Sequence, residues 1–397
     1  MQTKHFFTSK RLGAALVGMV VAAAASAATL SYVTGTTVQV GTNVYSMATA
    51  NFTGQGRQDM VTSDGTFWVN TSPGDGTVSF TAGPTMPAAI SVAAADLNGD
   101  GKPDLIQSYG TNQIAVFINT TPAGATSPTF AAPVYFNTGT DTNMVMAVDL
   151  NGDGLPDLVA LDWGANQVDV LMNTTTGGAL SFSNFQGFNV GSGSNWVAAG
   201  DLNGDGKPDL VVTNTVDNTV SVLINNTTTS SSTAAFYAQQ VFSVGNLPYS
   251  VALADVDGDG IDDIIVGNNS ENDISVLINT TTQSSTSTVA TASFGAEQTF
   301  ATGSVPNSVV AVDVNGNGKS EDIVAGNASD GTVSVFQNTA TSPGAASFAP
   351  EQPFTVGTSP AFMVVADMNG DGKPDLAVLN SEDANFGWWG SISVLLQ

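Results

Sequence analysis

The stretch "DLNGDGKPDL" occupies residues 96–105, and it recurs letter for letter at residues 201–210. Close copies begin at Asp149, Asp255, Asp313 and Asp367, so the phrase starts six times at intervals of 52 to 58 residues. A degenerate copy, "NFTGQGRQDM", begins at Asn51. Repeats of about 20–50 residues are typical of solenoids and propellers, so this periodicity decides the fold.

The sequence around each copy also repeats, as four short apolar segments. In one unit they are "SVALA" (250–254), "DIIVGN" (263–268), "DISVLIN" (273–279) and a segment with two aromatic residues six apart, Phe294 and Phe300. Turns rich in glycine and asparagine separate the segments. Four short strands per unit and seven units predict an all-β fold, a seven-bladed β-propeller of four-stranded antiparallel blades.

The ends of the chain complete the count of blades. The last unit stops at "SISVLLQ", residues 391–397, which is a third strand with no fourth strand after it. In the segment "YVTGTTVQVG", Tyr32 precedes Gly41 by the same nine residues by which Phe236 precedes Gly245. We therefore predict that this N-terminal strand pairs with the C-terminal blade and closes the ring, which removes the open edges. One propeller domain over residues 28–397 follows.

The first 27 residues have the pattern of a secretory signal peptide. Lys4, Lys10 and Arg11 precede an apolar run at residues 12–25, and small residues "ASA" end it at Ala25–Ala27. The run is too short for a comfortable membrane span, although an uncleaved anchor is the alternative. We expect an exported protein, secreted or extracellular, with the periplasm or the cell surface as further possibilities.

The composition after removal of this segment excludes several classes of function. Five basic residues remain against 34 acidic ones, a net charge of −29, which argues against nucleic acids and anionic membranes as partners. Cysteine is absent, so no disulfide stabilises the chain. The only histidine, His5, lies in the signal. The mature chain therefore has no Ser-His-Asp triad, no Cys-His pair and no histidine-ligated metal.

The repeated phrase has the donor spacing of a calcium loop. With Asp96 as position one, side-chain oxygens fall at positions one, three, five and nine, and glycines at four and six permit a tight turn. The first half of an EF-hand loop has this order, and its position seven ligates through a backbone carbonyl, so the side chain of Lys102 is free to vary. Hard oxygen donors favour calcium over magnesium, which keeps more of its waters and demands stricter geometry.

Six loops are predicted to hold about five or six calcium ions. Their predicted ligands are Asp96, Asn98, Asp100, Lys102, Asp104, Asp149, Asn151, Asp153, Leu155, Asp157, Asp201, Asn203, Asp205, Lys207, Asp209, Asp255, Asp257, Asp259, Ile261, Asp263, Asp313, Asn315, Asn317, Lys319, Asp322, Asp367, Asn369, Asp371, Lys373 and Asp375. The alternative is a set of Asx-Gly turns that bind nothing, but several acids in one loop repel one another unless a cation lies among them.

Two loops depart from the pattern. In the loop from Asp313, Asn317 replaces an acid, and one inserted residue makes Asp322 rather than Glu321 the ninth-position residue. In the first unit, Asn51, Thr53 and Gln55 carry no charge, so this loop is predicted to bind no ion.

With these loops at blade spacing, the chain resembles the FG-GAP/VCBS repeat proteins, whose blades form the seven-bladed propeller of integrin α-chains. In that family a D-x-[DN]-x-D-G-x-x-D loop between the first two strands of a blade binds calcium. The resemblance covers nearly the whole mature chain and implies adhesion, carbohydrate binding, or a non-catalytic module beside an enzyme. The sequence shows no inserted adhesion domain, so an integrin-like role does not carry over.

Aromatic residues are predicted to gather on the face opposite the calcium loops, at the turns between second and third strands or at the start of a first strand. They are Tyr109, Trp163, Trp196, Trp388 and Trp389. Exposed rings among Asn, Asp and Gly suit stacking on sugar rings, and the alternative is that they cap blades or seal the central channel. Trp68, inside a third strand, is expected to pack.

These observations predict an exported, calcium-binding and non-catalytic propeller that binds a glycan or an extracellular protein. The alternative is a glycan-cleaving enzyme, which needs two carboxylates about 5–10 Å apart. The candidate carboxylates in the turns are Asp162, Asp217, Glu271, Asp273, Glu382 and Asp383. A structural surface-layer protein is the third possibility.

Overall fold

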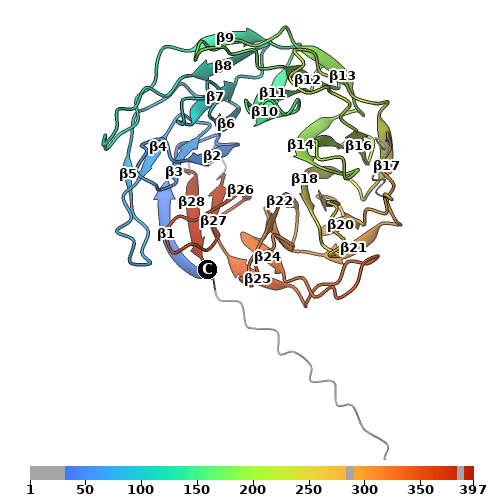
Figure 1. The fold of residues 1–397 in the computed structure, drawn as a ribbon. Coiled ribbons are helices and arrows are strands. Elements are labelled where there is room, and N and C mark those ends of the chain that lie inside the picture. Colours follow the sequence, from blue (N-terminus) through green and yellow to red (C-terminus); the bar gives the residue numbers. More distant parts are fainter. Residues whose placement is uncertain (1–31, 283–289, 382–388) are drawn as a thin grey trace, which may run out of the picture.

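A computed structural model describes residues 32–282, 290–381 and 389–397. The alternating apolar segments of each repeat form one four-stranded antiparallel sheet, and seven such sheets surround a central axis (Figure 1). This arrangement confirms the predicted seven-bladed propeller. The described residues contain no helix that is long and apolar enough to cross a membrane.

Each blade follows the chain from its innermost to its outermost strand. Blade 1 contains β2 (Met47–Ala50), β3 (Asp59–Thr62), β4 (Phe67–Asn70) and β5 (Phe80–Ala82), and blade 2 contains β6 (Ser91–Ala95), β7 (Asp104–Ser108), β8 (Gln113–Phe117) and β9 (Val134–Asn137). Blade 3 contains β10 (Thr142–Val148), β11 (Asp157–Asp162), β12 (Gln167–Leu171) and β13 (Gln186–Asn189), and blade 4 contains β14 (Ser194–Gly200), β15 (Asp209–Asn214), β16 (Thr219–Leu223) and β17 (Gln240–Ser243). Blade 5 contains β18 (Pro248–Ala254), β19 (Asp263–Asn268), β20 (Asp273–Leu277) and β21 (Gln298–Ala301), and blade 6 contains β22 (Pro306–Val312), β23 (Asp322–Asn327), β24 (Thr332–Phe336) and β25 (Gln352–Thr355). Blade 7 contains β26 (Pro360–Ala366), β27 (Asp375–Asn380), β28 (Ser391–Leu396) and, from the other end of the chain, β1 (Val33–Gln39).

The ring closes through the two ends of the chain, as the sequence predicted. Strand β1 pairs antiparallel with β28, with Val38 opposite Ile392. Just beyond the strand, the N–H of Gly390 donates to the carbonyl of Gly41, and the N–H of Val40 donates to the carbonyl of Gly390, both at 2.9 Å. The N-terminal strand is therefore the fourth strand of the last blade, and it covers the edge of β28 that would otherwise be unpaired.

Edge-to-face aromatic pairs join the outer parts of neighbouring blades. Phe188 packs on Phe236 with ring centroids 4.8 Å apart, and Phe242 packs on Phe294 at the same distance. In each pair the second aromatic of one blade meets the first aromatic of the next, which explains the six-residue spacing in the sequence. Blade 6 continues this pattern onto the N-terminal strand, where Tyr32 contacts Phe354 at 5.4 Å.

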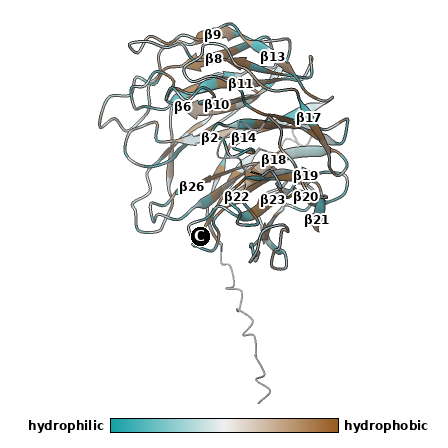
Figure 2. Cartoon of the chain, turned by 45° about the vertical axis from the view of Figure 1, so that its right-hand side comes forward, coloured by the Kyte–Doolittle hydropathy of each residue, from teal (hydrophilic) through white to brown (hydrophobic). Residues whose placement is uncertain are grey.

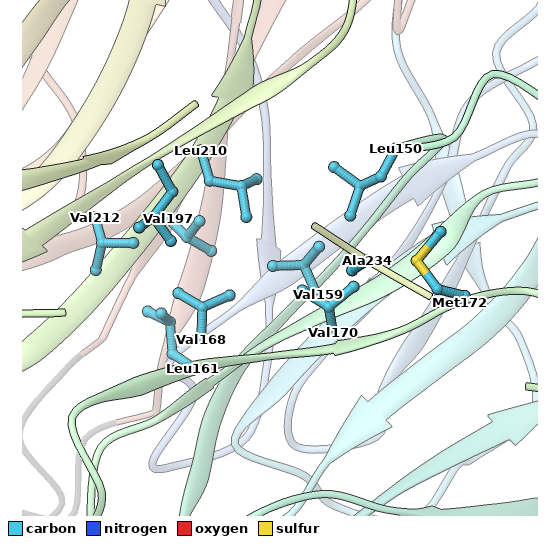
Figure 3. Packing of buried hydrophobic residues seen from close by; sticks show 11 residues of the cluster. Leu150, Val159, Leu161, Val168, Val170, Met172, Val197, Leu210, Val212 and Ala234 are labelled. Carbon is cyan, nitrogen blue, oxygen red and sulfur yellow. The ribbon is translucent and has the colours of Figure 1, made fainter. Parts of the chain in front are cut away.

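The hydrophobic core lies between adjacent sheets. The second strand of each blade is sandwiched on both sides, and β15 is buried at all of its residues. Figure 3 shows one interface, where Val159, Leu161, Val168 and Val170 of blade 3 approach side chains of blade 4. Apolar colouring follows the strands, and the hydrophilic residues concentrate in the connections (Figure 2). Because the core is built from the strands, the polar loops at the two rims can vary in sequence and bind ligands without disturbing it.

Candidate functional site

The repeated phrase forms the connection between the first and second strands of a blade, on one face of the ring that we term the loop face. In blade 2, Gly99 and Gly101 have φ angles of 73° and 82°, a left-handed conformation that suits glycine. The carboxylate of Asp96 accepts hydrogen bonds from the N–H groups of Gly99 (2.8 Å) and Gly101 (2.7 Å). The glycines thus fold the loop back around the first aspartate.

Positions three and five stabilise the same turn. Asn98 Oδ1 accepts the N–H of Asp100 at 2.9 Å, and Asp100 Oδ1 accepts the N–H of Lys102 at 3.0 Å. The lysine therefore contributes its backbone to the loop, and its side chain is not needed there. The loops beginning at Asp149, Asp201, Asp255, Asp313 and Asp367 repeat the bonds from position four and position six to the first aspartate.

The ninth-position aspartate is buried and ties the loop to the blade. Asp104 is fully buried, and its two oxygens accept the N–H of Leu97 at 3.1 Å and the N–H of Asn119 at 2.8 Å. Equivalent pairs of bonds are made by Asp59, Asp157, Asp209, Asp263, Asp322 and Asp375. This carboxylate therefore joins the start of each loop to the end of the third strand, in addition to any role toward a cation.

Burial makes the charge on these aspartates costly. It raises the pKa of Asp157, Asp209 and Asp263 to about 7, although the backbone hydrogen bonds oppose the rise. Nearby loop carboxylates raise the pKa further, because like charges disfavour ionisation: positions five and one act on Asp157 and Asp209, and positions three and one act on Asp263. A cation bound among these groups would favour the ionised form instead.

A recurring asparagine links six of the seven loops to the next blade. The Nδ2 group of Asn119 donates to the carbonyl of Pro103 in its own blade and to the carbonyl of Phe52 in blade 1, both at 3.0 Å. The bonds to the preceding blade recur at Asn173, Asn225, Asn279, Asn338 and, across the junction from blade 1 to blade 7, Asn70. The sequence analysis assigned no role to these residues, although their recurrence after the third strand was visible in it.

The connection between the third and fourth strands of one blade also reaches the loop of the preceding blade. The N–H of Gly344 in blade 6 donates to Asp257 Oδ2 in blade 5 at 2.6 Å. In the same way, Asn151 Nδ2 of blade 3 donates to the carbonyl of Ser231 in blade 4 at 3.0 Å. In the loops of blades 3 and 5, the third position therefore contacts the neighbouring blade, so a change in the conformation of either loop would alter the contacts at that blade interface.

The donor set of the acidic loops fits calcium. In blade 5, Asp255, Asp257 and Asp263 each offer one carboxylate oxygen, and these oxygens all lie within 4.8 Å of one another. Oxygens that ligate one calcium ion at about 2.3–2.6 Å lie up to about 5 Å apart across the ion, so this spacing suits it. If calcium binds here, Asp255, Asp257 and Asp263 would hold it and Ile261 would present its carbonyl.

The two divergent loops keep the fold of the others. In blade 6, Asp322 rather than Glu321 makes the ninth-position bonds, and Glu321 instead contacts Lys319 Nζ at 3.6 Å. In blade 1, Thr53 Oγ1 donates to Asp59 at 3.1 Å, which places a hydroxyl where the other loops carry a loop carboxylate or amide. The neutral loop is thus held by its own hydrogen bonds.

The opposite face of the ring, which we term the turn face, carries the turns between second and third strands. Trp163 and Trp389 are exposed there, at 51 % and 63 % of their surface. Tyr109 is partly buried against the core, its hydroxyl donates to Gln107 Oε1 at 2.8 Å, and burial raises its pKa to about 12. Trp388 lies outside the described residues. Trp163 and Trp389 are therefore the most exposed of the described members of the predicted set.

Trp196 lies at the central axis instead. Its ring packs on Phe362 with centroids 5.0 Å apart and planes at 33°. Because β14 and β26 belong to blades 4 and 7, these side chains meet across the channel. Trp68 lies in β4 and packs against the core formed by blades 1 and 7.

The carboxylates considered for an enzyme hold turns in place. Burial alone would raise the pKa of Asp162. Hydrogen bonds from Thr140, Asp141 and Ala165 outweigh this effect and lower the pKa. Asp169, which the sequence analysis did not consider, accepts the N–H of Gly139 beside it.

The remaining carboxylates of that set accept hydrogen bonds in or beside the turns or lie beyond the described ranges. Glu271 and Asp273 share one turn of blade 5, where burial and the charge of Glu271 raise the pKa of Asp273. Asp217 accepts the N–H of Ser192, Glu271 that of Asn246, and Asp273 the side-chain amide of Asn268. Glu382 and Asp383 lie outside the described residues. Among the described residues, no candidate carboxylate lines the axial cavity at the turn face.

Comparison with known proteins agrees with the repeat pattern. The FG-GAP-like repeat family matches residues 51–107, 149–212, 201–266, 255–321 and 319–378, which is more than half of the chain. No curated protein sequence matches it.

Similar solved structures include BBS1N in complex with ARL6DN soaked with mercury, with a TM-score of 0.58, 12 % identity, and coverage of 92 % of this chain and 96 % of that chain. The same complex soaked with lead has a TM-score of 0.57, 11 % identity and the same coverage. At these identities the likeness shows the fold alone.

Proposed function

We propose that this chain, which belongs to the FG-GAP-like repeat family, is an exported, non-catalytic binding module whose ring is stabilised by calcium. The loop face would hold the ions, and the turn face would bind an extracellular protein or glycan. The apolar run and small-residue end of the first 27 residues support export. The similar structure of BBS1N is a complex with another protein, ARL6DN, which supports a binding role for the fold.

The observation that carries the proposal is the difference between the two faces. Six acidic loops of one geometry lie on the loop face, and five of them accept a hydrogen bond from an asparagine of the next blade. The turn face presents Trp163 and Trp389, more than half of whose surface is exposed. Exposed aromatic side chains are enriched where proteins bind partners, because they offer large contact areas at low entropic cost.

Calcium binding is tested by titration into protein that has been treated with chelator and dialysed. We expect calorimetry to show about five or six ions per chain, with affinities near 10⁻⁴ M. A magnesium titration under the same conditions should give weaker binding. A chain that takes up no calcium would remove the first half of the proposal.

Ligand binding is tested with a glycan array and a panel of extracellular proteins, each probed in calcium. We expect Trp163→Ala and Trp389→Ala to weaken a true ligand by about 1–3 kcal/mol without lowering the melting temperature. The matched control is Tyr135→Ala, because Tyr135 is 54 % exposed but lies on the outer strand β9. Equal losses in all three variants would contradict a turn-face site.

A further inference from the structure

The central channel opens at the turn face into a cavity of about 300 Å³. Its lining comes from the starts of the first strands of blades 1, 2, 3, 4, 5 and 7, and these strands surround the axis in Figure 1. The size lies at the lower end of the range for small-molecule sites, about 300–1,000 Å³.

Aromatic rings from distant blades meet in this cavity. Trp196 and Phe362 contact each other across the axis at 5.0 Å, and Tyr249 and Tyr45 lie at the rim. Tyr45 is 56 % exposed, so much of its ring faces solvent. These rings offer flat apolar surfaces at different angles around one small space.

The cavity also presents polar groups that the described protein leaves unused. Within the described residues, the hydroxyls of Tyr45 and Tyr249 and the side-chain amide of Asn143 make no hydrogen bond. Asn195 differs, because its Nδ2 group donates to the carbonyl of Tyr249 at 2.9 Å and fixes the wall. Three free polar groups therefore surround the aromatic surfaces.

The charge of the site limits the class of ligand. None of the described residues that line the cavity is charged, so an ionic ligand would find no counter-charge. The strongly acidic chain, with a net charge of −26, would in addition repel anions. A purely apolar ligand would leave the hydroxyls and the amide unpaired as water is displaced, which is unfavourable.

We propose that the axial cavity binds a single neutral sugar ring, such as the terminal residue of a glycan. The apolar faces of the sugar would stack on Trp196 or Tyr45, and its hydroxyls would bond Tyr249 and Asn143. This inference rests on the proposed binding function, but it concerns a site distinct from Trp163 and Trp389 and needs no calcium ligand.

The test uses the whole mature chain in calcium and saturation-transfer NMR, which detects weak binding. The probes are the neutral methyl glycosides of glucose, galactose, mannose and N-acetylglucosamine, with methyl glucuronide as the charged control. We expect at least one neutral glycoside to bind and the glucuronide not to bind. Binding should also change the tryptophan fluorescence of a chain that carries Trp163→Phe and Trp389→Phe, in which Trp68, Trp196 and Trp388 remain.

Variants locate the site. Tyr249→Phe and Asn143→Ala each remove one polar group and retain the ring packing, so we expect about a tenfold loss of affinity with an unchanged melting temperature. The matched control, Tyr135→Phe, should bind as the wild type does. Glycoside binding that is unaffected in both pocket variants would overturn the assignment.

The outcomes separate the two proposals. If no neutral glycoside binds, but an array ligand is lost in Trp163→Ala, the axial site is wrong and the binding module stands. If neither glycosides nor array ligands bind, both proposals fail.

Discussion

The loop of blade 1 and the loop of blade 2 have nearly the same backbone and very different charge. The paired glycines have φ angles of 69° and 79° in blade 1, and of 73° and 82° in blade 2. In blade 1, Asn51 Oδ1 accepts the N–H of Gly56, as the carboxylate of Asp96 accepts that of Gly101. The neutral loop shows that the turn needs an oxygen acceptor and two glycines but no negative charge.

The comparison separates two functions within the repeated phrase. The ninth-position aspartate is kept in the neutral loop, where Asp59 accepts the N–H groups of Thr53 and Asn70 at 3.0 and 2.9 Å. The acids at positions one and five are lost there. We infer that position nine is needed to build the blade in both loops and serves a cation only in the acidic ones, whereas the acids at positions one and five are not needed for the turn.

Removal of calcium should produce the largest effect. At ten times the dissociation constant, each site contributes about 1.4 kcal/mol to the free energy of unfolding. About five or six sites then contribute about 7–8 kcal/mol, comparable to the whole stability of an ordinary domain. Scanning calorimetry in 1 mM calcium and in EDTA should show a large fall in melting temperature on chelation. An unchanged melting curve would contradict calcium binding by the loops.

Stability should fall with rising pH in the chelated protein but not in the calcium-loaded protein. In the ion-free ring the pKa of Asp157, Asp209 and Asp263 is about 7, above the ordinary value of 3.8, so the folded state binds extra protons between these values. The stabilisation from these extra protons is fully present below pH about 4 and is lost as the pH rises through about 7, which lowers the free energy of unfolding by a few kcal/mol.

In calcium the ions compete with those protons, so stability should not fall over the same range of pH. Melting temperatures between pH 4.5 and 7.5, measured with and without EDTA, check the two slopes. Parallel curves would mean that the buried aspartates do not interact with a cation.

Replacement of position nine should destabilise both loops in EDTA. Asp59→Asn and Asp104→Asn each turn an acceptor of a buried N–H into a donor, and we expect a loss of about 2–4 kcal/mol without calcium. In calcium the loss should stay the same in Asp59→Asn and grow in Asp104→Asn, because Asp104 is also a predicted calcium ligand. Asp100→Asn is the matched control, which should matter only in calcium. Urea denaturation of the three variants measures the difference. A calcium-dependent loss in Asp59→Asn would contradict the neutral role of blade 1.

Charging the neutral loop should create a site. The combined substitution Asn51→Asp, Thr53→Asn and Gln55→Asp restores the residues found in blade 2. We expect one more bound calcium by calorimetry and a gain of about 1.4 kcal/mol in 1 mM calcium. In EDTA the variant should be less stable than the wild type, because like charges repel in the empty loop. No change in stoichiometry would mean that blade 1 lacks another requirement.

Much of the fold was predictable from local repetition. The phrase that starts at Asp96 fixed the number of blades, and the register of Tyr32 against Gly41 predicted the closing strand, which β1 and β28 confirm. Two aromatics six apart also marked the outer strands of blades 2 to 6, but their pairing across blades, such as Phe188 with Phe236, needed the structure. Contacts within a unit repeat with the sequence, whereas contacts between units depend on how the blades are placed.

The sequence by itself determined the blade count, the ring closure and the positions of the acidic loops, because these follow from spacing along one unit. The tertiary structure alone decided which groups from different blades meet. It joined Asn119 to the carbonyl of Phe52, covered Asp257 with Gly344, and brought Trp196 onto Phe362 across the axis. The physical reason is that a side chain's partners in a closed ring come from other blades, 67 residues away for Asn119 and 298 for Asn70, and no local pattern records that distance.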